Sequence, residues 1–470
     1  MGNATTASVT GVQVAPAKSA IRDLPIAKVW AFAVGQFGWA LLSGIISNWL
    51  VYFYQPDQET ISQGQTVFVP QGLVVLGIVT VVGGITAFAR FFDAFVDPAV
   101  ASLRCDAKSG RRMPFLKFAA LPLAVVTVLV FWSPINGTSW VNAAFLFVTV
   151  IGYYIALTFY CTPYNALIAE LGHDSKQQLT ISTAISFTWV AGTAIAYVAP
   201  VIWGAFVPMM GRITAIRVTF TIMAAVAFVC MLVPPLAIRE KDYVNSHPTS
   251  ESTIESLKQT FGDGEFRKFV CSDVVYWVAI TTFQTGLPFF VTSLLKLPET
   301  TTTIYFVLMT GVSVLFYLPV NILANKVGKK RLLLVAFVIF TCAFAFAGAL
   351  GSAVLGFIPA MAQGLVLSVV GAIPMAAFGI LPQAIVANIA DASSKTTGQD
   401  RQGMFYAART FAMKMGQSVA MLLFTGVSTI GMASGAGYRI AAVCAAVLCG
   451  LGGIVFAFYN EKKVLGVLET

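Results

Sequence analysis

The sequence Arg-Phe-Phe-Asp-Ala-Phe-Val-Asp-Pro at residues 90–98 places three ionisable side chains at the end of an apolar run that begins at Gly72. If the run is a helix, Asp93 and Asp97 lie four residues apart on one face, with Arg90 on a neighbouring face. A charge at membrane depth costs several kcal/mol unless it is paired or hydrated. We therefore interpret the two aspartates as a cation-binding pair, the ordinary alternative being solvated charges at a helix end.

The composition of the chain is that of a polytopic membrane protein. Of its 470 residues, 57% are hydrophobic and 10% are charged, whereas a soluble domain has about 25% charged residues. The sequence contains about twelve apolar stretches of roughly twenty residues, the length that crosses about 30 Å of hydrocarbon. The alternating pattern of barrel strands is absent, so we predict an all-α polytopic membrane protein.

The predicted membrane helices form two groups of six, separated by a polar stretch. The first group covers residues 27–54, 72–97, 114–132, 141–170, 179–205 and 213–237. The second group covers residues 267–295, 300–325, 332–350, 355–390, 403–430 and 438–459. The predicted domains are an N-terminal tail (1–26), a six-helix bundle (27–237), a linker (238–265), a second bundle (266–460) and a C-terminal tail (461–470).

The basic residues indicate the orientation of these helices. A net charge of +9 could suggest a nucleic-acid partner. Most lysines and arginines, however, fall in short loops on the side that both termini and the linker share, which is typical of cytoplasmic loops. We predict a monomeric multi-pass protein of the cell membrane with both termini in the cytoplasm, and with the lipid bilayer rather than nucleic acid as its partner.

The sequence contains no constellation typical of a soluble enzyme. His173 and His247 have no partner at metal or triad spacing, and the seven cysteines are scattered without a CxxC pair. A GxxxxGK[ST] motif for ATP is absent as well. We therefore predict that the protein is not an enzyme and has no cofactor, and that any transport uses a gradient or runs downhill.

Two short basic loops repeat between the halves. Residues 106–112 read DAKSGRR and residues 325–331 read NKVGKKR, and each loop follows the second predicted helix of its half. A glycine turn with paired basic residues at matching positions indicates a duplicated six-helix unit. The pattern resembles the signature loop of the major facilitator superfamily, whose fold is two six-helix bundles around a central cavity. The residues expected to close the cytoplasmic face through salt bridges are Asp106, Arg111, Arg112, Lys329 and Lys330.

A more specific resemblance extends over nearly the whole chain. Residues 90–98, followed by SGRRMPF at 109–115, resemble the helix 2 signature of the glycoside–pentoside–hexuronide:cation symporters, the melibiose-permease family. GQFG at residues 35–38 is similar to that family too, and so is the stretch 397–417, in which Lys414 occupies the place of a membrane lysine. The resemblance implies a symporter that moves a sugar, glycoside or hexuronide-like solute by alternating access.

The resemblance also implies which residues bind the coupling cation. Asp93 and Asp97 match the acids of the family, and Thr158 matches its helix 4 threonine when that helix is aligned on Pro163. Val96 replaces an amide ligand, which removes one oxygen from a Na⁺ site at the two acids. Two close carboxylates can instead hold a proton, because repulsion and burial favour protonation of one of them. We expect H⁺ in preference to Na⁺.

The substrate is less closely defined by the resemblance. The two sugar-binding acids of the family are replaced here by Ala40 and Cys161. A neutral glycoside could bind by stacking and amide hydrogen bonds, and an organic acid could bind to cationic side chains. The predicted substrate-binding residues are Gln36, Trp39, Tyr153, Asn165, Arg409 and Lys414. Arg90 is expected to be the charge partner of the acids. The alternative functions for the whole protein are a transporter of lysolipids or other amphiphiles, and a non-transporting receptor or scaffold.

Overall fold

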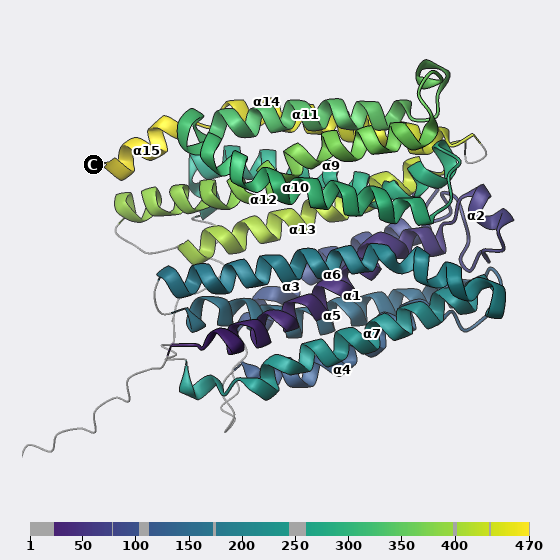
Figure 1. The fold of residues 1–470 in the computed structure, drawn as a ribbon, viewed down its shortest axis with the longest axis horizontal. Helices are drawn as coiled ribbons and strands as arrows, with labels where there is room; N and C mark the ends of the chain where they lie inside the picture. The colour runs from purple at the N-terminus through teal and green to yellow at the C-terminus, as the bar shows by residue number, and fades with distance from the viewer. Residues whose placement is uncertain are drawn as a thin grey trace, which may run out of the picture.

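The structure, a computed structural model, consists almost entirely of helices in the residues that it describes, which are 23–77, 79–102, 112–172, 175–243, 260–397, 402–431 and 434–469. Twelve helices of this part are long and lie side by side (Figure 1). The first six are α1 (Ile26–Tyr54), α3 (Val81–Ser102), α4 (Met113–Val130), α5 (Trp140–Leu171), α6 (Ser175–Met210) and α7 (Arg212–Ala237). The other six are α9 (Gly264–Phe289), α10 (Thr300–Val327), α11 (Lys329–Ala349), α12 (Ala360–Thr397), α13 (Gln402–Val427) and α14 (Ala436–Ala457). The short helices are α2 (Gln58–Ser62), η1 (Glu240–Asp242), η2 (Phe290–Leu294), η3 (Ala353–Leu355) and α15 (Glu461–Glu469).

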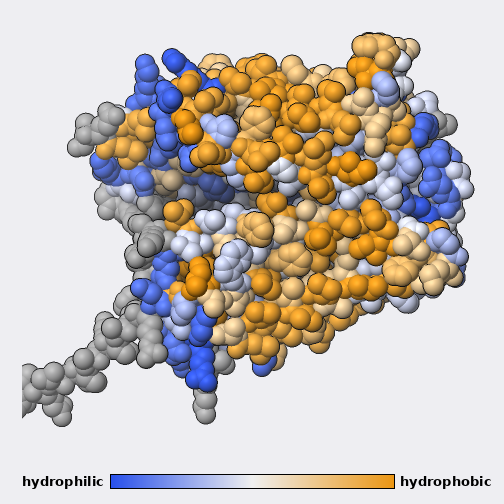
Figure 2. Space-filling view, viewed as in Figure 1, coloured by the Kyte–Doolittle hydropathy of each residue, from blue (hydrophilic) through white to orange (hydrophobic). Residues whose placement is uncertain are grey.

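The outer surface of the helices suits a lipid environment. Hydrophobic side chains cover the middle of the molecule, and hydrophilic ones gather at its two ends (Figure 2). Ten helices among the described residues are long and apolar enough to cross a membrane. The other two long helices, α3 and α13, carry the charged side chains Arg90, Asp93, Asp97, Arg409 and Lys414. These helices confirm the predicted all-α membrane fold.

The predicted second helix begins nine residues too early, because the described residues 72–77, 79 and 80 lie in a loop before α3. Gly72 and Gly77 have φ angles of 84° and 71°, and Leu76 has a φ of 54°. A positive φ is incompatible with a right-handed helix, and a β-branched or bulky residue rarely adopts it. Hydropathy does not detect these backbone angles. The helix predicted from the apolar run therefore includes residues that belong to the loop before α3.

The other end of α3 extends further than predicted, to Ser102. Asp93 and Asp97 therefore both lie inside a helix, and the second of them is five residues before its end. The spacing of four residues places the two carboxylates on one face, as the sequence indicates.

Glycines let α1 pack closely against its neighbours in the first half. A Cβ atom at Gly38 would lie 2.6 Å from the carbonyl oxygen of Ala227, and one at Gly35 would lie 2.5 Å from Cγ of Pro234. Both neighbours belong to α7. The sequence GQFG at residues 35–38 therefore acts in helix packing in this structure.

The two halves meet mainly along two pairs of helices. In the first pair, α3 and α13, Ser418 Oγ donates a hydrogen bond to the carbonyl oxygen of Ala87 at 3.1 Å. In the second pair, α6 and α10, the ring of Tyr197 stacks on Phe306 with centroids 3.5 Å apart. Thr303 Oγ1 also donates to the carbonyl oxygen of Tyr197 at 2.5 Å.

A largely buried carboxylate joins the halves at the far face, the end of the molecule opposite to the start of α1 and the end of α14 (Figure 1). Glu299, just before α10, accepts hydrogen bonds from three residues of the first half. They come from Tyr52 Oη at 2.9 Å, Trp203 Nε1 at 2.5 Å and Arg212 Nη2 at 2.6 Å. The ion pair with Arg212 is nearly inaccessible to solvent.

A second carboxylate makes the reciprocal contact. Asp57, in the first half, is fully buried. It accepts from the backbone N–H of Thr60 at 2.9 Å, from Thr292 Oγ1 at 2.7 Å and from Ser293 Oγ. The two hydroxyls belong to η2, a π-helical turn at the end of α9. We call Glu299, Asp57 and their donors the far-face gate; it is closed here, while the surface is hollowed between the halves at the opposite, terminal face (Figure 2).

The first prediction concerns Glu299. The change Glu299→Gln leaves Arg212 buried without its carboxylate, and breaking such a pair costs about 2–5 kcal/mol. We expect the far-face gate to open more often, so that a thiol introduced by Met421→Cys becomes at least tenfold more reactive towards an impermeant maleimide added at the far face. Glu59→Gln is the matched control, because the Glu59 side chain is 43% exposed and its ion pair with Lys296 is long, at 4.0 Å. Equal labelling of the two variants would contradict a gating role.

The second prediction concerns the pair α3 and α13. A Cβ atom at Gly83 would overlap Oγ1 of Thr425 and lie 3.2 Å from its Cβ, so Gly83→Ala should separate these helices at the far face. We expect faster maleimide labelling of the same reporter thiol, and restoration of slow labelling by the second change Thr425→Ala. Among the described residues, a Cβ atom added at Gly84 has one neighbour within 4 Å, Val79 Cγ1 at 3.3 Å. If Gly84→Ala raises labelling as much as Gly83→Ala does, the steric explanation is wrong.

Candidate functional site

Two carboxylates of α3 share one ammonium group of α13. Nζ of Lys414 lies 2.7 Å from Oδ2 of Asp93 and 2.5 Å from Oδ2 of Asp97. The side chain of Asp93 is only 5% exposed, whereas that of Asp97 is 28% exposed. Because α3 belongs to the first half and α13 to the second, these three residues, the acid–lysine cluster, join the halves.

Hydroxyl groups from α5 complete the acid–lysine cluster. Thr158 Oγ1 donates to Oδ1 of Asp93 at 2.5 Å, in the position that the sequence predicts. Thr162 Oγ1 donates to Oδ1 of Asp97 at 3.4 Å. Thr162 is not among the predicted site residues, although the sequence contains a pattern that indicates it. Thr158 and Thr162 are four residues apart, as are Asp93 and Asp97, so each threonine on one helix face can meet one aspartate on the other.

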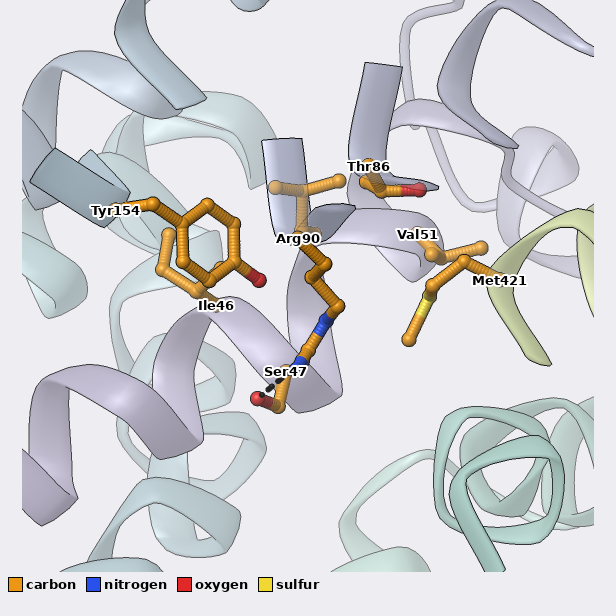
Figure 3. A pocket seen from close by; sticks show the side chains of 8 residues that line it. Ile46, Ser47, Val51, Thr86, Arg90, Tyr154 and Met421 are labelled. Atoms are coloured by element: carbon orange, nitrogen blue, oxygen red, sulfur yellow. Dashed lines mark hydrogen bonds between the residues drawn. The ribbon is translucent and has the colours of Figure 1, made fainter. Parts of the chain in front are cut away.

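Arg90 does not have the role that the sequence predicts for it. Its Nη1 donates to Oε1 of Gln417 at 2.6 Å, and its Nη2 donates to Oγ of Ser47 at 3.2 Å. The guanidinium also lies 5.6 Å from the centre of the Tyr154 ring (Figure 3). No carboxylate of the described residues lies within 4.0 Å of it. The expectation that Arg90 forms an ion pair with the acids is therefore corrected, because both acids form their ion pairs with Lys414 instead.

Arg409 lies in a separate ion pair within the second half. Its Nε is 2.8 Å from Oδ2 of Asp273, and its Nη2 is 3.1 Å from Oδ1 of the same residue. Both side chains are buried, and the guanidinium lies 5.9 Å from the centre of the Phe269 ring. A bidentate pair of this kind fixes the geometry of both partners. Arg409 thus holds α13 against α9, and its predicted contact with substrate stays a prediction.

The other predicted substrate-binding residues lie on α1 and α5. Gln36 is buried and accepts a hydrogen bond from Nε1 of Trp39 at 3.1 Å. Tyr153 is buried and donates to Oγ of Ser43 at 3.3 Å. Asn165 is exposed. Among the described residues these four make no hydrogen bond to the acid–lysine cluster, so their role as substrate ligands remains a prediction.

The two basic loops are bound by carboxylates at equivalent places. Glu240, which follows α7, accepts from the backbone N–H groups of residues 112–113 at 2.7 and 2.9 Å. Glu461, which follows α14, accepts from those of residues 329–330 at 2.9 and 3.1 Å. A carboxylate is favoured at a helix N-terminus because the free N–H groups point towards it. In each half, the segment after the sixth long helix thus caps the N-terminus of the third long helix, which is α4 in the first half and α11 in the second.

These contacts stay within one half each. Arg112 also forms an ion pair with Glu170 at 2.8 Å, at the end of α5. Lys330 Nζ donates to the carbonyl oxygen of Ala457 at 2.7 Å. Asp106 and Arg111 lie outside the described residues. The predicted salt-bridge clamp between the halves belongs to a conformation closed at the terminal face, so it stays a prediction.

Known transport proteins are similar to this chain. Residues 31–459 match the family described as MFS/sugar transport protein. The uncharacterised symporter YjmB of Bacillus subtilis (strain 168) is 23% identical over 74% of this chain and 75% of its own length. The inner membrane symporter YicJ of Escherichia coli (strain K12) is 25% identical, over 46% of this chain and 47% of that protein. The uncharacterised symporter YnaJ of Bacillus subtilis is 22% identical, and this chain spans only 36% of its length.

Solved structures share the fold at low sequence identity. The nucleoside transporter NupG superposes with a TM-score of 0.62 at 13% identity, over 93% of this chain and all of that one. A bacterial homologue of the human lysosomal transporter Spinster, inward-facing and unoccupied, gives a TM-score of 0.62 at 12% identity, over 94% and 97% of the two chains.

These findings confirm the resemblance that residues 90–98 and the twelve predicted helices indicate, and they confirm that the protein is not an enzyme. The match spans nearly all of the described helices, from α1 to the end of α14. The chain is therefore a multi-pass membrane transporter that belongs to the MFS/sugar transport protein family.

Proposed function

We propose that the protein is a cation-coupled symporter that moves a sugar, glycoside or hexuronide-like solute across the cell membrane by alternating access. The observation that supports this proposal is the acid–lysine cluster, in which Lys414 lies within 2.7 Å of both Asp93 and Asp97. Its ammonium group occupies the place where an external cation would be attracted. Lys414 therefore acts as a tethered cation that competes with the coupling ion.

The coupling ion in this proposal is H⁺. A proton needs no coordination shell, and the oxygens of Asp93 and Asp97 are already in close contact with Lys414 and Thr158. Protonation of Asp97, the more exposed of the two acids, would remove one of the two ion pairs of Lys414. The freed ammonium group would then face the solute, and the pair α3–α13 would loosen.

Na⁺ is the second candidate, and Thr162 is the observation that favours it. Na⁺ prefers several oxygen ligands. Two carboxylates with the hydroxyls of Thr158 and Thr162 offer four such groups, which offsets the oxygen lost at Val96.

The orientation and the domain boundaries follow the sequence prediction. Arg112, just before α4, and residues 325–331, between α10 and α11, lie on the terminal face, so we propose that this face is cytoplasmic and that the far-face gate closes the outer side. We retain the linker at 238–265 between two bundles, and a monomer as the working unit. Gln36, Trp39, Tyr153, Asn165 and Lys414 are the proposed solute contacts, whereas Arg409 is left out because Asp273 binds it.

The third prediction is gradient-driven uptake. In proteoliposomes given a panel of sugars, glycosides and hexuronides, an acid-outside pH gradient should accelerate uptake of at least one solute more than fivefold, and a protonophore should abolish the effect. A Na⁺ gradient at constant pH should have no effect. Uptake that responds only to Na⁺ would overturn the choice of ion. Transport of lysolipids alone, or no transport of any solute, would favour the alternative functions.

The fourth prediction distinguishes the role of Asp97 in coupling from that of Thr162. Asp97→Asn imitates the protonated acid, so it should abolish gradient-driven uptake while solute exchange between the two sides continues. Asp242→Asn, a change of an exposed acid in η1, is the control and should behave like the parent protein. Thr162→Val should leave proton-driven uptake within twofold of the parent. A loss of uptake in Thr162→Val, restored by raised Na⁺, would support the sodium site instead.

A further inference from the structure

Arg90 is a charge at membrane depth that the proposed coupling does not use. Its two hydrogen-bond acceptors, Gln417 and Ser47, are neutral. The acids one and two turns further along α3, Asp93 and Asp97, form ion pairs with Lys414. Neutral acceptors compensate a guanidinium less completely than a carboxylate does, because they carry no net negative charge to offset its positive charge. Arg90 thus has the capacity to bind an additional anion.

The guanidinium lines a small pocket between the two halves. The pocket is bordered by α1, α3, α5 and α13, and Figure 3 shows the Arg90 side chain crossing it, with Tyr154 on one side and Thr86 on the other. Ile46 and Met421 supply apolar walls. One guanidinium, several hydroxyl groups and an apolar wall are the chemistry that binds a carboxylate, and no acidic residue borders this pocket in the described part of the chain.

The pocket has a volume of about 10 Å³ here, room for about one water molecule, so a solute group could enter it only when the halves move. Arg90 precedes Asp93 by three residues, which is a rise of about 4.5 Å along the helix. The pocket therefore lies beside the acid–lysine cluster, on the side of the far-face gate. Since both halves border it, rocking of one half against the other would change its access.

We propose that Arg90 binds a carboxylate of the transported solute, and that the preferred substrates are small carboxylic acids, sugar acids among them, rather than neutral glycosides. The inference rests on the proposed function and assigns a ligand group to a residue one turn before Asp93 on α3. On binding, the planar guanidinium exchanges the amide oxygen of Gln417 for two carboxylate oxygens, the geometry that suits arginine best.

The same arrangement supplies coupling between solute and cation. A bound carboxylate near Asp93 adds a negative charge to the acid–lysine cluster, which favours a cation there. By reciprocity, the cation favours the carboxylate by the same factor, which is about tenfold for couplings of this kind. A neutral solute would lack this contribution.

Binding to the purified full-length protein tests the proposal with three carboxylates, D-glucuronate, D-gluconate and L-lactate, and with D-glucose as the neutral counterpart of glucuronate. At least one carboxylate should bind, and glucuronate should bind at least tenfold more tightly than glucose. Arg90→Gln should abolish that preference, and Arg90→Lys should retain part of it. Arg217→Gln is the matched control, because this arginine of α7 donates to the carbonyl oxygen of Phe131, away from the pocket; it should bind like the parent.

A second variant covers the case in which Arg90→Gln does not fold. Gln417→Ala removes the competing acceptor from Arg90, so carboxylates should bind as tightly as in the parent or more tightly. Weaker carboxylate binding in Gln417→Ala, unchanged carboxylate preference in Arg90→Gln, or no carboxylate binding by the parent would each overturn the proposal. Gradient-driven uptake of neutral sugars alone would overturn it while leaving symport intact. Absence of gradient-driven uptake of every solute would instead overturn the proposed function.

Discussion

The ammonium group shared by two carboxylates is the interaction on which the centre of this molecule depends. α3 carries three charged side chains, and an isolated helix of this kind is costly in lipid because ions lose their hydration. α13 has the complementary difficulty, with a lysine near its middle. When the two helices pack together, Lys414 satisfies Asp93 and Asp97, and each helix removes the electrostatic cost of the other. The least apolar pair of membrane helices thus has to lie at the junction of the halves.

Four other carboxylates divide according to the half that supplies their side-chain or helix N-terminal donors. Glu299 and Asp57 bind donors of the opposite half, at the far face. Glu240 and Glu461 cap helices of their own half, at the terminal face. Rocking of rigid halves breaks the first kind of contact and preserves the second. The far-face contacts therefore set the relative stability of conformations, whereas the caps keep each half rigid in all of them.

The sequence was sufficient for the helices, for the pairing of Asp93 with Asp97 and for the place of Thr158, because these depend on local periodicity and on a resemblance that includes those positions. It was insufficient for the start of α3, where the angles at Gly72, Leu76 and Gly77 turn an apolar run into a loop. Hydropathy measures transfer to lipid, and a loop on the membrane boundary can satisfy it as well as a helix.

Side-chain partners across helices were the least predictable part. Arg90 was expected to pair with the acids because the three lie on neighbouring faces of one helix. Its contacts depend instead on the depth of α1 and α13 relative to α3, which places Ser47 and Gln417 within reach. The partner of Arg409, Asp273, is 136 residues away in the chain, and no spacing rule connects the two. Such pairs follow from helix rotation and offset, which a single sequence does not contain.

The balance of charges around Arg90 has an electrical consequence. With both acids ionised, Arg90 and Lys414 together offset Asp93 and Asp97, so the sum over these four side chains is zero. A membrane potential of 100 mV acts on a displaced elementary charge with about 2.3 kcal/mol. In the empty transporter these four side chains carry no net charge, so the membrane potential does almost no work on them when the halves move. The return step of the empty transporter is therefore insensitive to voltage. A solute with one negative charge that moves together with one proton keeps that balance, and the whole cycle then runs on concentration differences alone.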